Sequence, residues 1–305
     1  MSKYHRGLLL VLGTAIISGF SIWLNAFAVK GIEPSLFTGM KNLFVGLIIA
    51  SLVMLSTEWT HVLHLKLHQW TRLLLVGLVG GSVPFVLFFT GLSMTSGAKA
   101  GFIHKTLFIY VAIAAFFVLK EKITKKIFIG LAALLIGQIL FLQISPQSLG
   151  LGDLFIFAAT ILWALEVVIS KSLLKTVAPK IVAGARMLFG GAFIWIYLYT
   201  TGQAEVVASL TFSQMNWILI TTLLLLGYVI TFYHGLRDVP AHVATSILAL
   251  GAPITLLLSA VFLEKAISGR QILGMLIIAF GILIITRFVL KPSVTQHHVL
   301  ARDNR

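Results

Sequence analysis

Residues 101–122 read GFIHKTLFIYVAIAAFFVLKEK and contain an apolar run that is long enough to cross a lipid bilayer. The hydrocarbon core of a membrane is about 30 Å thick, and a helix needs about 20 apolar residues to span it. Before charge returns at Lys120, the run carries two potential cations, His104 and Lys105. Because ionisable side chains are costly inside the bilayer, they usually serve a function or have a partner. The stretch therefore predicts a membrane helix with a candidate site inside it.

The composition of the whole chain indicates a polytopic membrane protein. Of its 305 residues, 59% are hydrophobic and only 10% are charged, and the mean hydropathy is +1.03. A soluble domain could not cover so much apolar surface with so few charges. The formal net charge of +14 sits mostly in the connections between apolar runs, so it indicates membrane orientation and not nucleic-acid binding. The chain has no cysteine, which excludes disulfides and Cys-ligated metals.

Ten apolar runs of membrane-spanning length can be recognised along the chain. They are long, do not alternate strictly, and are joined by short connections, which favours helices over barrel strands. The fold class that we predict is an all-α membrane protein with ten transmembrane helices. The expected spans are residues 7–29, 34–55, 70–92, 98–119, 126–143, 153–174, 179–199, 214–236, 241–263 and 271–290.

The distribution of Lys and Arg predicts that both termini are cytoplasmic. If the N-terminus is inside, most of these cations fall in inner connections, as the positive-inside rule requires. We therefore expect a multi-pass protein of the cell (inner or plasma) membrane. The outer connections then hold only Lys30, Lys99, Lys265 and Arg270. Three cations, Lys41, Lys105 and Arg186, remain within spans.

The chain consists of two similar halves, which we place at residues 1–146 and 147–305. Each half has five spans, and because five is odd the halves would insert with opposite orientation. Inverted repeats of this kind are the architecture of secondary transporters, whose substrate site lies between the halves. Shifts of 143 to 145 residues align, in order, Pro34 with Pro179, Lys41 with Arg186, Ala98 with Ala241, Glu121 with Glu264, and Gly137 with Gly281.

The duplicated spans, the two prolines that start the second span of each half, and the LKEK and LEKA ends at residues 119–122 and 263–266 resemble the EamA family. That family belongs to the drug/metabolite transporter superfamily, and the resemblance covers residues 7–290. It implies a central cavity lined by spans 1, 3, 4, 6, 8 and 9, and the export or import of amino acids, other metabolites or drugs. Span nine has Pro253 where span four has Tyr110, so we expect an interruption of the helix only in the second half.

Depth in the membrane pairs Glu166 with Arg186. A helix rises about 1.5 Å per residue. Arg186 follows Pro179 by seven residues, and Glu166 lies at nearly the same distance from the inner end of its own span. We expect a structural ion pair, or a proton-coupling carboxylate if Glu166 has no partner.

No carboxylate is expected at the depth of Lys41 and Lys105 in the outer half of the membrane. Two cations without a counter-ion require a wet cavity, neutral lysines or an arriving anion. We expect a polar cavity in which Lys105 meets a carboxylate or phosphate of the substrate. Lys105 could instead extend to the outer headgroups or to backbone carbonyls. His104 could border the same cavity or pack against a neighbouring helix.

Polar and aromatic residues complete the predicted substrate site. Ser21 and Asn25 share one face of span one, and the repeat places Glu166 and Ser170 at the same positions of span six. These residues could line the cavity or support helix packing. We expect Trp23, Phe108 and Trp163 to contact the apolar part of the substrate.

Two prolines and four glycines are candidates for mechanical roles. Pro84 and Pro253 lie inside spans, where proline opens the backbone for a kink or a gate. The glycines could support close packing of spans five and ten, or a homodimer. They are Gly130, Gly137, Gly274 and Gly281.

The function that we predict is a secondary transporter, an exporter by family resemblance, of a small metabolite with an anionic group such as an amino acid. The alternatives are export of neutral or cationic drugs or metabolites, and a channel or lipid-handling protein. An intramembrane enzyme is disfavoured because the chain has no HExxH or GxSxG motif and no paired intramembrane acids. We predict no cofactor, no metal and no nucleic-acid partner; the expected partners are the substrate and the lipid bilayer.

Overall fold

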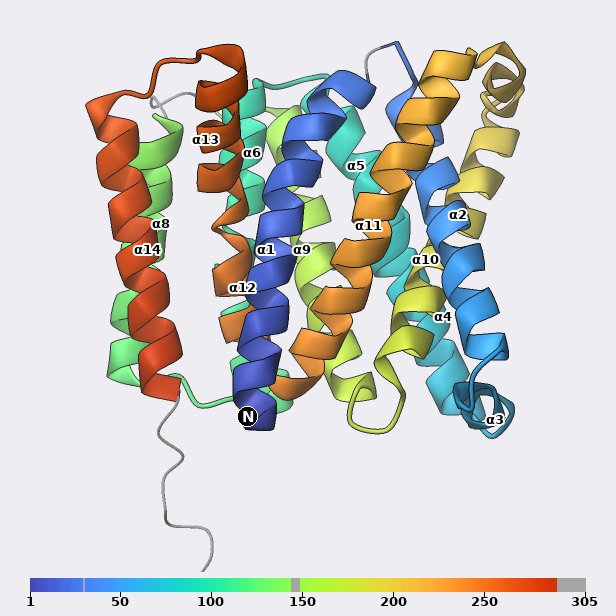
Figure 1. Cartoon of the computed structure of the whole chain (residues 1–305), viewed down its shortest axis with the longest axis horizontal. Helices are drawn as coiled ribbons and strands as arrows, with labels where there is room; N and C mark the ends of the chain where they lie inside the picture. Colours follow the sequence, from blue (N-terminus) through green and yellow to red (C-terminus); the bar gives the residue numbers. More distant parts are fainter. Residues whose placement is uncertain (30, 144–148, 290–305) are drawn as a thin grey trace, which may run out of the picture.

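Ten helical spans, which run alternately up and down, form the part of the chain that the computed structural model describes, residues 1–29, 31–143 and 149–289 (Figure 1). No strand occurs among these residues. The predicted fold class is therefore confirmed. Seven spans are single helices: α1 (Lys3–Ala28), α2 (Pro34–Met54), α8 (Lys125–Leu142), α9 (Leu151–Leu173), α10 (Pro179–Thr200), α11 (Phe212–Asp238) and α14 (Gly269–Val289).

The other three spans are interrupted helices. The third consists of α4 (Leu67–Gly81) and α5 (Val83–Leu92), and the ninth of α12 (Ala241–Leu248) and α13 (Gly251–Leu263). The fourth consists of α6 (Gly97–Lys105), α7 (Leu107–Ala114) and a π-helical turn, η1 (Ala115–Leu119). Two short helices, α3 (Glu58–Leu63) and the 3-10 helix η2 (Ala204–Ser209), lie in connections.

The expectation that only the second half is interrupted is wrong, because span four breaks at Thr106. The Thr106 hydroxyl donates to the carbonyl of Ile103 at 2.6 Å. Its backbone N–H is shared between the carbonyls of Phe102 (3.1 Å) and Ile103 (3.2 Å). A tightened turn closed by a side-chain hydroxyl thus takes the place of a proline. Pro84 and Pro253 are both buried near interruptions, Pro84 in the first turn of α5 and Pro253 near the start of α13.

The structure corrects the register of the repeat in spans four and nine. Helices α6 and α12 begin at Gly97 and Ala241, which are 144 residues apart. Lys120 and Glu264, also 144 apart, both adopt left-handed backbone angles (φ 57° and 53°) and end their helices. The alignment of Ala98 with Ala241 and of Glu121 with Glu264 is therefore one residue out. The two helices end at equivalent backbone positions, whereas the Glu-Lys pair that the two halves share in sequence is displaced by one residue from one half to the other.

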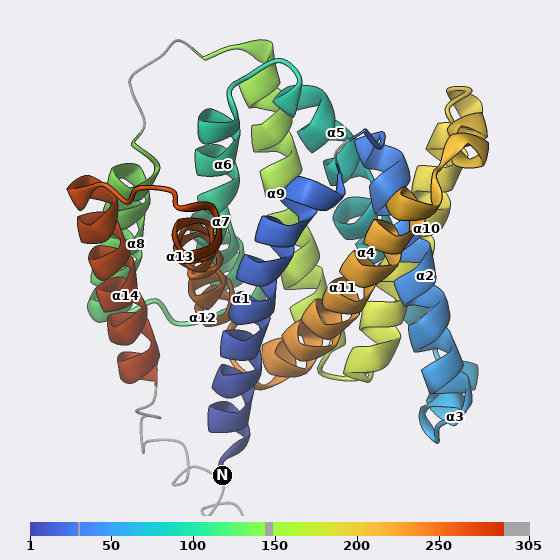
Figure 2. The ribbon, with the colours of Figure 1, turned by 45° about the horizontal axis from the view of Figure 1, so that its top comes forward.

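Helices α8 and α14, which lie side by side at one edge of the bundle, pack closely because glycines line their contact. A Cβ on Gly274 would lie 2.6 Å from the backbone nitrogen of Phe141, and one on Gly137 would lie 2.9 Å from that of Ile278. Gly130 and Gly281 meet across the same contact. The four glycines thus join the two halves within one chain, one helix from each (Figure 2).

We expect Gly274→Ala to lower the melting temperature of the detergent-purified protein, because the new methyl group meets backbone atoms that cannot move aside. Overpacking of this kind costs about 1–3 kcal/mol. The matched control is Gly13→Ala, where a Cβ meets no atom within 4 Å. Since alanine is the better helix former, Gly13→Ala should leave the melting temperature unchanged or raise it. Equal melting temperatures for the two variants would contradict the close contact.

Candidate functional site

His104 packs into a group of aromatic rings formed by three spans. Its ring centroid lies 4.8 Å from that of Trp163 on α9 and 5.6 Å from that of Phe88 on α5. Phe88 and Trp163 lie 5.7 Å apart, so the three rings are in mutual contact. The Nδ1 atom of His104 is buried without a hydrogen-bond partner. In this conformation His104 therefore packs against neighbouring helices, which is the second of the two positions expected for it.

Lys105, the next residue, is partly exposed and forms no ion pair within the described part of the chain. Gly97, Gly101 and Lys105 are spaced four residues apart and share one face of α6. A Cβ at Gly97 or Gly101 would meet no atom within 4 Å. This face of α6 is therefore not packed against another helix at Gly97 and Gly101, and Lys105 continues it at the end of the helix.

Lys41 has neutral partners only. Its Nζ donates to Oδ1 of Asn25 at 3.2 Å and lies 4.5 Å from the ring centroid of Phe37. Asn25 in turn donates to the Ser21 hydroxyl at 3.3 Å. The Lys41 residue is only 6% exposed. The polar stripe predicted on span one thus contacts a buried cation, which is held by an amide dipole and an aromatic face.

Trp23 lies on the neighbouring part of α1, against the second half. Its ring centroid is 5.3 Å from that of Phe262 on α13 and 5.2 Å from that of Phe27. The indole Nε1 is buried without a hydrogen-bond partner. Phe108, by contrast, is 2% exposed within the apolar core, so it offers almost no surface to a ligand in this conformation.

Glu166 is the centre of a buried polar network that joins three spans. Its Oε1 atom accepts from the Tyr233 hydroxyl at 2.5 Å and from the Ser170 hydroxyl at 2.7 Å. Arg186 Nε lies 3.9 Å from the same oxygen, which is an ion pair without a direct hydrogen bond. The network links α9, α10 and α11, and Glu166 is 3% exposed.

The interrupted span three also contributes to this network through the carbonyl of Gly80. That oxygen accepts from Arg186 Nη2 at 3.0 Å and from Trp163 Nε1 at 3.1 Å. A Cβ on Gly80 would lie 2.2 Å from Cγ of Glu166, so only glycine fits there. Gly80 and Tyr233 were missed in the sequence because neither residue type marks a charge site inside a span.

Two further polar clusters lie at the ends of the bundle. At one end, Asp153 accepts from Lys99 Nζ at 2.6 Å and from the Thr95 hydroxyl at 2.7 Å. At the other, Glu121 contacts the start of α12 at Ala241. Their acids stand next to span ends in the sequence, but nothing there indicates which helix each one meets. Within the described residues, no group of His, Asp and Glu could hold a metal ion.

This arrangement, ten apolar spans with charged side chains buried among them, is that of an integral membrane transporter. A family model described as the EamA-like transporter family matches the chain twice, over residues 5–143 and 150–287. The chain belongs to the EamA-like transporter family.

The chain is also similar to curated transporters, and a solved structure shares its fold. The uncharacterized transporter YyaM of Bacillus subtilis is 22% identical over 95% of this chain and 97% of its own length. The uncharacterized transporter YetK of the same organism is 25% identical over 92% of this chain and 87% of its own length. A crystal structure with 17% identity shares the fold, with a TM-score of 0.74 over 93% of this chain and 99% of that one.

We expect Glu166→Gln to destabilise the purified protein strongly, because it leaves the Arg186 charge buried without a counter-ion. Removing one partner of a buried pair typically costs about 3–5 kcal/mol. The double variant Glu166→Gln/Arg186→Met should melt at a higher temperature than Glu166→Gln alone.

The control for this prediction is Glu58→Gln. Glu58 lies 3.7 Å from Lys180 in an ion pair whose side chains are 24% and 33% exposed. Such exposed pairs contribute about 0–1 kcal/mol, so the control should melt close to the wild type. If Glu166→Gln also melts like the wild type, the buried pair is not required for stability.

Proposed function

We propose that this protein is a secondary transporter that exports a small metabolite with an anionic group, such as an amino acid or an organic acid, by alternating access. The observation that carries the proposal is that Lys105, a cation within a span, has no counter-ion among the described residues. The residue is partly exposed on a face of α6 that is unpacked at Gly97 and Gly101, and no carboxylate of the described residues pairs with it. A substrate carboxylate or phosphate would supply the missing negative charge.

The surroundings of Lys105 also suit a substrate with an apolar part. His104, the preceding residue of the same helix, forms an aromatic group with Phe88 of α5 and Trp163 of α9. Lys41, with Asn25 and Ser21, is a second cationic group, which faces α1 and is buried in this conformation. A change of conformation that exposed Lys41 would add a second anion contact. The family relatives are described as transporters without a named substrate, which leaves the substrate class to this chemistry.

We expect anionic metabolites to raise the melting temperature of the wild-type protein but not that of Lys105→Ala. A ligand at 100 times its dissociation constant stabilises the native state by about 2.7 kcal/mol. Lys122→Ala, which removes an exposed lysine from a connection, is the matched control and should respond like the wild type. Compounds that stabilise the wild type are then tested as labelled substrates for exchange in proteoliposomes.

Two outcomes would contradict the anion contact. The first is stabilisation by neutral or cationic compounds in both proteins alike, which would favour the drug-exporter alternative. The second is an ion current or headgroup transfer without saturable exchange, which would favour a channel or a lipid-handling protein.

For localisation, we propose the cell (inner or plasma) membrane, with both termini in the cytoplasm. The described ends of the chain, at α1 and α14, lie at the same end of the bundle (Figure 1). An epitope tag before Met1 should become accessible to antibody only after the cells are permeabilised, and a tag inserted between α13 and α14 should be accessible without it. The reverse pattern of accessibility would place both termini outside the cell and contradict the proposal.

A further inference from the structure

The two ends of the molecule differ although the repeat makes them equivalent. Along α6, Gly97 is exposed and Gly101 and Lys105 are partly exposed. The positions 144 residues later are closed. They are Ala241, Thr245 and Ala249, which are 0%, 4% and 4% exposed. The same helical face is therefore open where α6 begins and closed where α12 begins.

The turns that lead into these helices differ in the same way. Before α6, Met94 is 55% exposed. Its equivalent before α12 is Asp238, whose side chain is 6% exposed and forms an ion pair with Arg6 at 3.1 Å. The next residue, Val239, is 1% exposed. The closed end is thus the one at which the chain begins.

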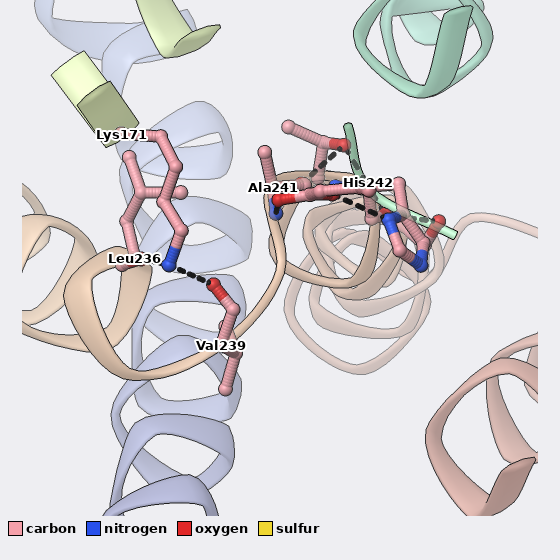
Figure 3. Close-up of polar contacts among 8 residues, drawn as sticks. Lys171, Leu236, Val239, Ala241 and His242 are labelled. Atoms are coloured by element: carbon pink, nitrogen blue, oxygen red, sulfur yellow. Dashed lines mark hydrogen bonds and ion pairs between the residues drawn. The ribbon is translucent and has the colours of Figure 1, made fainter. Parts of the chain in front are cut away.

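The closed end is held by Glu121, which comes from the first half and contacts the first turn of α12 in the second. Its Oε1 accepts from the Ala241 amide at 2.8 Å, and its Oε2 lies 2.6 Å from Nδ1 of His242 (Figure 3). Burial alone would raise the pKa of the Glu121 carboxyl, but the hydrogen bonds from His242 and the Ala241 amide lower that pKa below its ordinary value. A carboxylate only accepts, so Nδ1 is the donor. A negative charge here also suits the positive end of the α12 dipole.

Lys171 of α9 holds the other side of the same turn. Its Nζ donates to the carbonyl oxygens of Leu236 and Val239 at 2.7 Å each and to that of Arg237 at 3.0 Å (Figure 3). These are the last carbonyls of α11 and the turn beyond it, where a cation suits the negative end of the helix dipole. The turn from α11 to α12 is therefore held by a cation on one side and an acid on the other.

Among the described residues, the open end has no equivalent of the Glu121 contact. The residue 144 positions after Glu121 is Lys265, and its neighbour Glu264 is exposed without an ion pair among the described residues. At this end, Asp153 binds Lys99 and so holds α6 against α9, while the face of Gly97 and Gly101 stays open.

We propose that Glu121 is a lock that keeps the N-terminal end of the transporter closed. By holding the first turn of α12, it favours the conformation in which Lys105 is reached from the opposite end. Release of Ala241 and His242 from Glu121 is then required before the site can open toward the N-terminal end. The lock rests on the proposed alternating-access function, since it has a role in transport only if the two ends open in turn.

The test uses single cysteines, because the chain has none of its own. Gly101→Cys reports on the open end and Thr245→Cys on the closed end, and each is placed in wild-type, Glu121→Gln and Glu264→Gln backgrounds. The rate of reaction with a membrane-impermeant charged thiol reagent is measured in intact cells and in inside-out vesicles. No substrate is needed for this measurement.

We expect Thr245→Cys to react slowly in the wild type and about tenfold or more faster with Glu121→Gln, because charge-assisted hydrogen bonds to the helix are lost. Reaction at Gly101→Cys should slow in the same background. Glu264→Gln, the matched control, should change neither rate. Unchanged rates with Glu121→Gln, or a rise at both reporters, would overturn the lock.

Two further measurements keep the result unambiguous. If Glu121→Gln does not fold, His242→Ala removes one of the same contacts and should raise the rate at Thr245→Cys; no rise would overturn the lock. If the reporters shift as expected and no anionic metabolite is exchanged by the wild type, the lock stands and the proposed substrate class fails. If the wild type exchanges an anionic metabolite but the reaction rates of the reporters do not change, the proposed substrate class stands and the lock fails.

Discussion

A positive charge inside a membrane needs a negative or polar partner, and this requirement organises the interior of the protein. The three cations within the spans meet it in different ways. Arg186 has the Glu166 carboxylate at 3.9 Å and a backbone carbonyl at 3.0 Å. Lys41 has an amide oxygen and an aromatic face. Lys105 is partly exposed and has no ion pair or hydrogen bond from its side chain among the described residues. Two of the cations are thus part of the packed interior, and the third has no counter-ion among the described residues, which is the basis of the proposed substrate contact.

Polar contacts join the same helices that the apolar core brings together. The Glu166 network joins α9, α10 and α11, and the carbonyl at the interruption of span three enters it through Gly80. An interrupted helix leaves backbone carbonyls without intrahelical partners, and within a membrane these must find donors in the protein. Arg186 and Trp163 supply those donors. The break in the helix and the buried charge therefore stabilise each other.

The sequence predicts the spans because a bilayer imposes a length and a hydropathy that each run must satisfy. It also brings Glu166 and Arg186 to one depth, since the helical rise is fixed. It does not predict the interruption at Thr106, where a hydroxyl and a shared N–H act without proline. It does not predict that Glu121 meets Ala241, because that contact joins a connection to the start of a helix 120 residues further along the chain. Span length, hydropathy and depth in the membrane can be predicted from the sequence, whereas contacts between segments that are distant in the chain cannot.

The glycine contact between α8 and α14 has a mechanical consequence. These two helices, one from each half, lie together at one edge of the bundle, and α2, α3 and α10 lie at the opposite edge (Figure 2). Backbone meets backbone between α8 and α14, so neither helix can slide without losing van der Waals contact along its length. The opposite edge is joined in the same way, because a Cβ on Gly46 of α2 would lie 2.8 Å from the backbone nitrogen of Leu188 on α10. Close backbone contacts therefore tie the two halves together at both edges of the bundle, and any relative movement of the halves has to keep both contacts or break one of them.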